Sequence, residues 1–162
     1  MKPNRLLCLM AVLLLAAGFQ TGTARAQDAD ADAAYAEMQQ MLGLVPTFMK
    51  AFPKVAISPA WNEMKMLQMN PGTELSGKMK ELVGLAVAAQ IPCEYCVYFH
   101  TMAARANGAT DEEIREAIAM AAITRHWSTV LNGSQIDYET FKQEADQILA
   151  QAMKMAESEG KK

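Results

Sequence analysis

Cysteine and histidine are scarce in this sequence. Among 162 residues there are three cysteines and two histidines. Cys8 lies in an N-terminal apolar run, and the other two cysteines form a single C-x-x-C pair, Cys93 and Cys96. A disulfide between residues three apart closes a very small loop and constrains the unfolded chain little. The pair is therefore a poor structural staple, which points to a chemical role for the two thiols.

An excess of positive charge is also absent. The whole chain has 15 lysines and arginines against 18 aspartates and glutamates, a net charge of −3. If Lys2, Arg5 and Arg25 are removed with the N-terminal segment, 12 basic residues remain and the net charge becomes −6. An acidic chain repels the phosphate backbone of nucleic acids. We therefore expect no nucleic-acid partner.

The only long hydrophobic run extends from Leu6 to Phe19. Basic residues precede this run, and the small-x-small sequence Ala24-Arg25-Ala26 follows it. This order is typical of a secretory signal peptide, and the run is short for a membrane span. We predict a signal peptide over residues 1–26 and a periplasmic or secreted mature chain, with an uncleaved anchor as the alternative. Export would place the C-x-x-C pair in an oxidising compartment.

The alternation of apolar and polar residues that marks β-strands is missing, whereas helical patterns and helix caps recur. The sequence Thr110-Asp111-Glu112-Glu113, for example, forms a capping box before an apolar helical stripe. We predict an all-α chain with a single domain over residues 27–162 and an acidic, frayed start over residues 27–34. The predicted helices run to Leu42, from Ser58 to Met69, from Leu75 to Gln90, from Pro92 to Asn107, from Thr110 through Ala122, from Arg125 to Leu131, and from Tyr138 onward.

The helix predicted after Pro92 carries the sequence C-E-Y-C-V-Y-F-H. Residues three, four and seven apart share one face of a helix, so Cys93, Cys96 and His100 are expected on one stripe. Two adjacent thiols can form a disulfide, and a nearby imidazole can accept a proton from one of them. Glu81, on the preceding helix, can orient that imidazole as the third group of a catalytic triad does. Together these residues predict a dithiol redox site.

The two cysteines are activated by different groups. His100 can accept a proton from Cys96 or stabilise its thiolate, and such a contact can shift a thiol pKa by several units at about 1.4 kcal/mol each. The helix N-terminus favours negative charge on Cys93, but by only about 0.3–1 kcal/mol when exposed. We therefore predict Cys96 as the nucleophile, with Cys93 as the alternative.

The pattern E-x11-C-x2-C-x3-H is complete in this chain, and the sequence N-G-A-T-D-E-E-I-R-E-A follows it at residues 107–117. With these motifs, residues 71–133 resemble the carboxymuconolactone decarboxylase superfamily in its alkylhydroperoxidase D-like branch. The resemblance implies an all-α fold assembled as homotrimers or homohexamers. It also implies thiol-dependent reduction of hydroperoxides without a cofactor or resident metal, with electrons from a thiol or a protein donor.

Carried over residue by residue, the resemblance implies that Cys96 is the peroxidatic cysteine, that Cys93 resolves its sulfenic acid, and that Glu81 and His100 relay protons. Tyr95 stands where the redox branch often has a histidine, so that part of the relay is missing here. Two alternatives remain open. One is dithiol–disulfide exchange without peroxidase activity. The other is a non-catalytic oligomeric or metal-binding module, because two thiolates, an imidazole and a carboxylate suit tetrahedral zinc.

Overall fold

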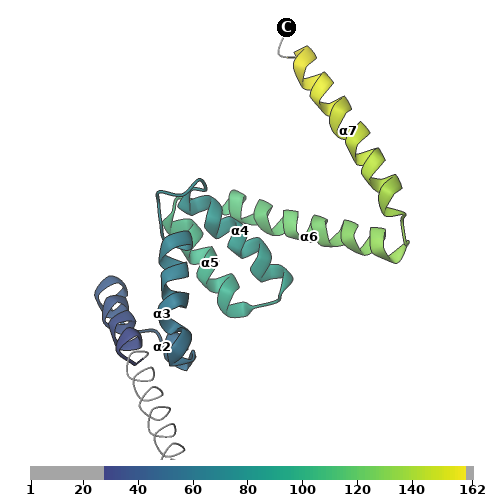
Figure 1. The fold of residues 1–162 in the computed structure, drawn as a ribbon. Coiled ribbons are helices and arrows are strands. Elements are labelled where there is room, and N and C mark those ends of the chain that lie inside the picture. Colours follow the sequence, from purple (N-terminus) through teal and green to yellow (C-terminus); the bar gives the residue numbers. More distant parts are fainter. Residues whose placement is uncertain (1–27, 160–162) are drawn as a thin grey trace, which may run out of the picture. The chain divides into compact units, whose positions relative to one another are not determined.

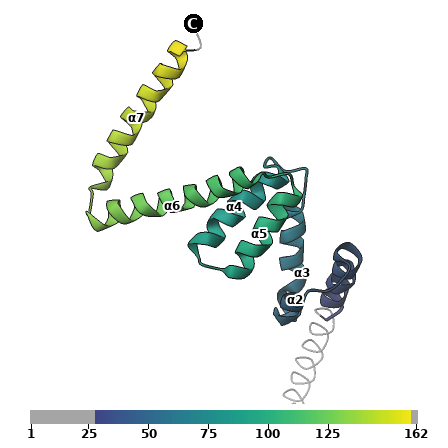
Figure 2. The same cartoon turned by 180° about the vertical axis from the view of Figure 1, so that it is seen from behind.

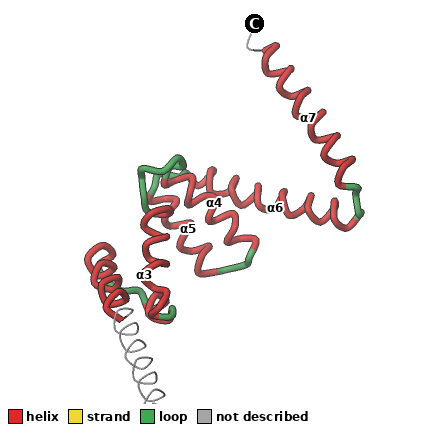
Figure 3. Tube along the Cα trace, in the orientation of Figure 1, coloured by secondary structure: helices red, strands yellow, loops and turns green. Residues whose placement is uncertain are grey.

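The computed structural model describes residues 28–159, and this part of the chain consists of helices joined by turns and loops (Figure 3). The all-helical prediction is confirmed for these residues. None of the helices described is both long and apolar enough to cross a membrane. The signal peptide predicted over residues 1–26 lies outside the described residues.

The described residues fall into two compact units, the first ending at Glu74 and the second beginning at Leu75. Each unit has a cluster of buried apolar side chains of its own. The single domain predicted over residues 27–162 stays a prediction.

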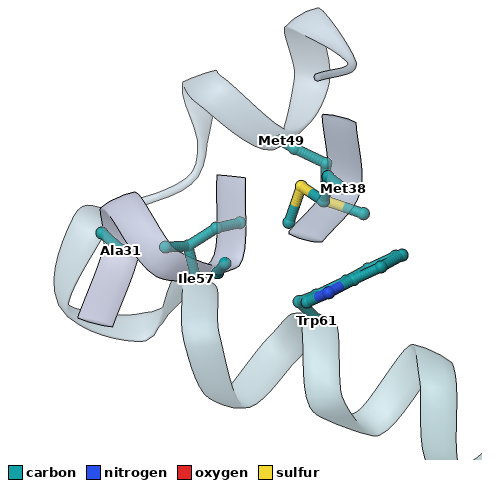
Figure 4. Close-up of a cluster of buried hydrophobic side chains, with 6 residues drawn as sticks. Ala31, Met38, Met49, Ile57 and Trp61 are labelled. Atoms are coloured by element: carbon teal, nitrogen blue, oxygen red, sulfur yellow. The ribbon is translucent and has the colours of Figure 1, made fainter. Parts of the chain in front are cut away.

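The first unit packs its helices around one apolar cluster (Figure 4). The helices are one over residues 28–42, α2 (Thr47–Ala51), and α3 (Lys54–Glu63), which continues into the π-helical segment η1 (Met64–Gln68). Buried side chains from the first three helices meet in this cluster: Ala31, Ala34, Met38, Met49, Ile57 and Trp61. The Trp61 indole donates a hydrogen bond of 2.9 Å from Nε1 to Glu37 Oε2, so the one polar atom of the ring has a partner.

The acidic segment predicted to be frayed is helical from residue 28 onward, so that prediction is wrong. The aspartates of this segment are exposed, whereas two of its alanines face the apolar cluster. Ala31 and Ala34 are both buried in the cluster, one helical turn apart. Burial of these two alanines holds the first turns of the helix in place. In the sequence, the run of aspartates hides this pattern.

Helix α3 begins at Lys54 rather than at the predicted Ser58, so Pro59 lies inside it. A proline within a helix removes one backbone donor and crowds the preceding turn. Ile57 and Trp61, on either side of the proline, are fully buried. Full burial of an isoleucine side chain alone contributes about 1.5–3 kcal/mol, and a tryptophan adds more, so packing outweighs the helix-breaking tendency.

The second unit contains α4 (Gly77–Gln90), α5 (Glu94–Ala106), α6 (Asp111–Gly133) and α7 (Tyr138–Glu159). Helix α4 packs against both α5 and α6 (Figures 1 and 2). Leu85 of α4, Ala104 of α5 and Ile114 of α6 form the buried centre of this packing. Helix α4 therefore holds the other two helices in place, and its residues are positioned from both sides.

The capping box at the start of α6 is confirmed. Thr110 Oγ1 accepts from the backbone N–H of Glu113 at 3.1 Å, and Glu113 Oε2 accepts from the backbone N–H of Thr110 at 2.8 Å. The prediction of a separate helix from Arg125 to Leu131 is wrong, because α6 continues unbroken to Gly133. The residues between Ala122 and Arg125 include neither glycine nor proline, so nothing ends the first helix there.

Helix α7 begins at Tyr138, as predicted, and the apolar side chains along it are not buried. Phe141, Ile148, Leu149 and Met155 are all exposed within the described part of the chain. An amphipathic helix of this kind normally covers its apolar stripe against another surface. The predicted assembly into trimers or hexamers stays a prediction.

We expect Thr110→Ala to lower the free energy of unfolding by about 0.5–2 kcal/mol, because it removes the side-chain cap of α6. Thr129→Ala is the matched control. Its hydroxyl donates to the Arg125 carbonyl on the exposed part of α6 and caps nothing. The control is expected to stay within about 0.5 kcal/mol of the wild type. Urea unfolding followed by circular dichroism measures both, and equal losses in the two variants would contradict a specific role for the cap.

Candidate functional site

The site is built on the face of α4 that packs against α5. Three positions on this face, spaced four and three residues apart, meet side chains of α5 or of its C-cap, and these are Gly77, Glu81 and Gly84. This spacing keeps the three positions on one helical stripe. At one end, a Cβ on Gly77 would overlap the side chain of Asn107, which caps α5. At the other end, the Ala88 carbonyl accepts a hydrogen bond of 3.1 Å from the backbone N–H of Cys93.

Glu81 and His100 meet in the middle of this stripe. The distance from His100 Nδ1 to Glu81 Oε2 is 2.7 Å. The Glu81 carboxyl is buried, with 6% of the residue exposed, and His100 is half-buried. An ionised carboxylate can only accept hydrogen bonds, so in the tautomer that suits such a partner Nδ1 donates to Glu81 and Nε2 faces away from it. The structure thus brings together two of the four predicted site residues in the orientation expected of a base and its orienting group.

Cys93 was predicted to lie within the helix, but it lies just before the helix begins. It is the N-cap of α5, with an extended backbone (φ −95°, ψ 100°), and the helix begins one residue later at Glu94. Its sulfur turns back over the first turn and accepts a hydrogen bond of 3.3 Å from the backbone N–H of Cys96. The prediction that Cys93 shares a helical stripe with Cys96 and His100 is therefore wrong. Cys96 and His100, both within α5, remain one turn apart on the same face.

The two free cysteines shift each other's acidity in opposite directions. Hydrogen bonding from the Cys96 thiol, supported by the Cys96 backbone N–H, lowers the pKa of Cys93. The same contact raises the pKa of Cys96, because its proton is held against the partner sulfur. Of the two thiols, Cys93 is therefore the one that ionises first. The prediction that Cys96 is the nucleophile concerns the reaction itself, and it stays a prediction.

A shallow, mostly apolar depression lies along α5 beside the cysteines. Its volume is about 590 Å³, and its lining includes Pro92 and Glu94, the two residues that flank Cys93. Val97, Tyr98 and Met102 continue the lining along the helix. Tyr95, between the two cysteines, is 80% exposed and does not contribute a proton donor to the interior of the site. An apolar molecule could therefore approach the thiols along α5.

Within residues 28–159 there is no group of three or more histidine, cysteine, aspartate or glutamate side chains that could hold a metal ion. The other histidine, His126, lies on α6 and stacks edge-on against Trp127, with ring centroids 5.2 Å apart. The sequence prediction did not include Gly84, where an added Cβ would meet the imidazole ring of His100. The signal was present, since Gly84 lies one turn after Glu81 in a helix otherwise rich in alanine, leucine and valine.

The model of the carboxymuconolactone decarboxylase family matches residues 56–136, which is half of the chain. The resemblance inferred from the motifs is confirmed, and the match starts within α3. Among solved structures, the alkylhydroperoxidase AhpD core from Rhodospirillum rubrum has a similar fold. It has a TM-score of 0.59 and 23% identity, and the match covers 74% of this chain and 90% of that one.

A relative from Paracoccus denitrificans, described as uncharacterized protein 4 in cox locus, is 43% identical over 51 residues. These residues are 32% of this chain and 46% of the relative, so the match spans less than half of the relative's length.

We expect Cys93 to be alkylated faster than Cys96 in the fully reduced protein. Thiolates react and thiols do not, and the lowered pKa of Cys93 gives it a larger thiolate fraction than Cys96, whose pKa is raised. The ratio of initial rates should therefore grow from pH 9 towards pH 6. Brief exposure to limiting iodoacetamide, followed by peptide mass spectrometry, measures the ratio. Faster labelling of Cys96 across this range would mean that the hydrogen bond between the thiols has the opposite direction.

Proposed function

Because the chain belongs to the carboxymuconolactone decarboxylase family, we propose that it is a thiol-dependent oxidoreductase that reduces hydroperoxides through Cys93 and Cys96. The observation that carries the proposal is the α4–α5 pair of helices itself. It combines two neighbouring thiols, in which the Cys93 sulfur accepts from the Cys96 backbone N–H, with a buried carboxyl–imidazole pair, and Cys96 lies one helical turn from that imidazole. A dithiol supplies two electrons, and the imidazole can move the protons that accompany them.

In the proposed reaction Cys96 loses its proton to His100 and attacks the terminal oxygen of the hydroperoxide. The O–O bond breaks, the protonated imidazole returns the proton to the leaving oxygen, and an alcohol departs. Cys96 is left as a sulfenic acid. Glu81 holds the imidazole in one tautomer and stabilises its charged form during this transfer.

Cys93 completes the proposed cycle. Its thiolate, already stabilised at the helix cap, attacks the sulfenic sulfur of Cys96 and expels the oxygen as water after protonation. One hydroperoxide thereby takes two electrons from the pair and leaves a disulfide. A thiol or a protein dithiol must then reduce that disulfide. The low pKa of Cys93 suits the resolving role, because the second step needs a thiolate that is ready without a further base.

The setting of the reaction is part of the proposal. A signal peptide over residues 1–26 would deliver the enzyme to the periplasm or the exterior, where the electron donor must also be found. Assembly into a homotrimer or homohexamer would cover the apolar stripe of α7, which includes Phe141, Ile148 and Leu149. Light scattering at micromolar concentration that detects only monomers would remove the assembly from the proposal without affecting the chemistry.

A second candidate function, dithiol–disulfide exchange without peroxidase activity, is favoured by the position of Cys93. A sulfur at a helix N-cap with a lowered pKa is the arrangement in which the first cysteine of a C-x-x-C pair attacks an external disulfide. In that case Cys93 would be the attacking thiolate and Cys96 would resolve the mixed disulfide. The two functions differ in which sulfur reacts first and in whether peroxide is a substrate.

Mixing the reduced protein with a hydroperoxide, and separately with a small disulfide, is expected to show rapid oxidation by the hydroperoxide. His100→Ala should slow that reaction by about 10²-fold or more, the usual contribution of a general base. Glu81→Gln should slow it less, because this residue orients the base. The double variant should fall short of the product of the two losses, since the pair acts as a unit. Stopped-flow measurement of thiol oxidation gives all four rates.

The matched control is His126→Ala, which removes the exposed histidine of α6 and should leave the rate unchanged. Wild-type rates in both site variants would mean that Glu81 and His100 only support the fold. Oxidation by the disulfide but not by the hydroperoxide would replace peroxide reduction with dithiol–disulfide exchange.

The sulfenic acid is expected on Cys96. In Cys93→Ser the resolving thiol is gone, so a dimedone-type trap should label Cys96 after one equivalent of hydroperoxide. In Cys96→Ser the label on Cys93 should be much weaker, because His100 lies one turn from Cys96 and not at the helix cap. Mass spectrometry of the labelled peptides locates the adduct. Stronger labelling of Cys93 would assign the first attack to the cap thiolate.

A further inference from the structure

Gly84 lies in the middle of α4, one helical turn after Glu81, where its ordinary helical backbone does not require a glycine. Glycine destabilises a helix interior relative to alanine, so its presence there needs a reason in the packing. The three nearest heavy atoms to a Cβ built at this position all belong to one side chain, His100. The missing side chain therefore leaves space for the imidazole rather than for the backbone of a neighbouring helix.

The distances show how the ring lies on α4. The Cβ would be 2.5 Å from Cε1, 2.6 Å from Nδ1 and 2.9 Å from Nε2 of His100. If the Cβ lay in the plane of the imidazole ring, outside Cε1, it would be clearly farther from the two nitrogens than from Cε1. The three distances are instead nearly equal, so the Cβ position lies over the face of the ring. The face is thus pressed against the helix, and the edge that carries both nitrogens stays free for hydrogen bonds.

One of these nitrogens has its partner on the same helix. Nδ1 lies 2.7 Å from Glu81 Oε2, one turn before Gly84. Any Cβ at position 84 would be closer to the ring than van der Waals contact allows, so the ring would have to move. Phe99, the preceding residue of α5, stands edge-on to the ring with ring centroids 5.4 Å apart. Movement of the ring would lengthen or break the hydrogen bond to Glu81.

We propose that Gly84 is a positioning residue for the reaction, because it provides the flat seat that holds the His100 ring with Nδ1 on Glu81 and Nε2 free to exchange a proton. This inference rests on the proposed function for its effect on rate, but the seating itself is a structural claim. Gly84 does not touch the reacting atoms, and it acts only through His100.

Gly84→Ala is the test, with Gly133→Ala as the matched control. Gly133 is also a helical glycine, in α6, and a Cβ there meets nothing within 4 Å. Gly84→Ala should slow thiol oxidation by hydroperoxide by about 10²-fold, the cost of an ångström-scale misplacement of a catalytic group. Gly133→Ala should leave the rate unchanged and raise the melting temperature, because alanine is the better helix former.

The double variant His100→Ala/Gly84→Ala separates seating from general helix packing. With the ring removed, alanine at position 84 should cause no further loss of rate and should raise the melting temperature relative to His100→Ala alone. If Gly84→Ala by itself fails to fold, the double variant should still fold. A double variant that is less stable than His100→Ala would mean that the glycine serves the contact between α4 and α5, and would overturn the proposal.

A measurement independent of activity completes the test. The Nδ1 proton held between His100 and Glu81 should appear as a protected imidazole resonance in the wild type and in Gly133→Ala, and should be lost in Gly84→Ala. Its persistence in Gly84→Ala, or its absence from the wild type, would overturn the inference. Loss of the resonance in a protein that never reacts with hydroperoxide would support the seating and refute the proposed function instead.

Discussion

The hydrogen bond between Glu81 and His100 is the constraint on which the second unit depends. Burial of a carboxyl group is costly unless hydrogen bonds compensate it, so the pairing with His100 favours one register of α4 against α5. The contacts at either end agree with that register, since Gly77 meets Asn107, the C-cap of α5, and the Ala88 carbonyl accepts from Cys93, its N-cap. Small residues on the same stripe let the two helices approach closely enough for the bond to form.

The sequence predicted the fold class and most of the site because the determining signals are local. The capping box at Thr110 involves only residues within one turn, and the structure has both of its hydrogen bonds. The pairing of Glu81 with His100 followed from motif spacing and a short connection between two helices. The family match over residues 56–136 agrees with the resemblance that these spacings indicated.

The misjudged features depend on contacts between residues far apart in the chain, or on a choice between two backbone conformations. Pro59 marked a helix start by local rules, but burial of Ile57 and Trp61 against another helix extends α3 across it. Cys93 could have continued the helix or capped it, and as the cap it accepts from Cys96, which lowers its own pKa and raises that of Cys96. Gly84 stands out in the sequence as a glycine one turn after Glu81, but only the position of His100 shows which side chain occupies the space that it leaves.

The sulfur of Cys93 also couples the redox state of the two cysteines to the stability of the first turn of α5. As a thiolate it accepts the backbone N–H of Cys96 and supplies negative charge to the positive end of the helix dipole. As half of a disulfide it would be neutral and a poorer acceptor, so the first turn would lose part of its cap. Any interaction that stabilises the dithiol over the disulfide raises the reduction potential of the couple. In the proposed cycle, the helix that presents the two thiols would thus make their disulfide easier to reduce, which would favour regeneration by weakly reducing thiols.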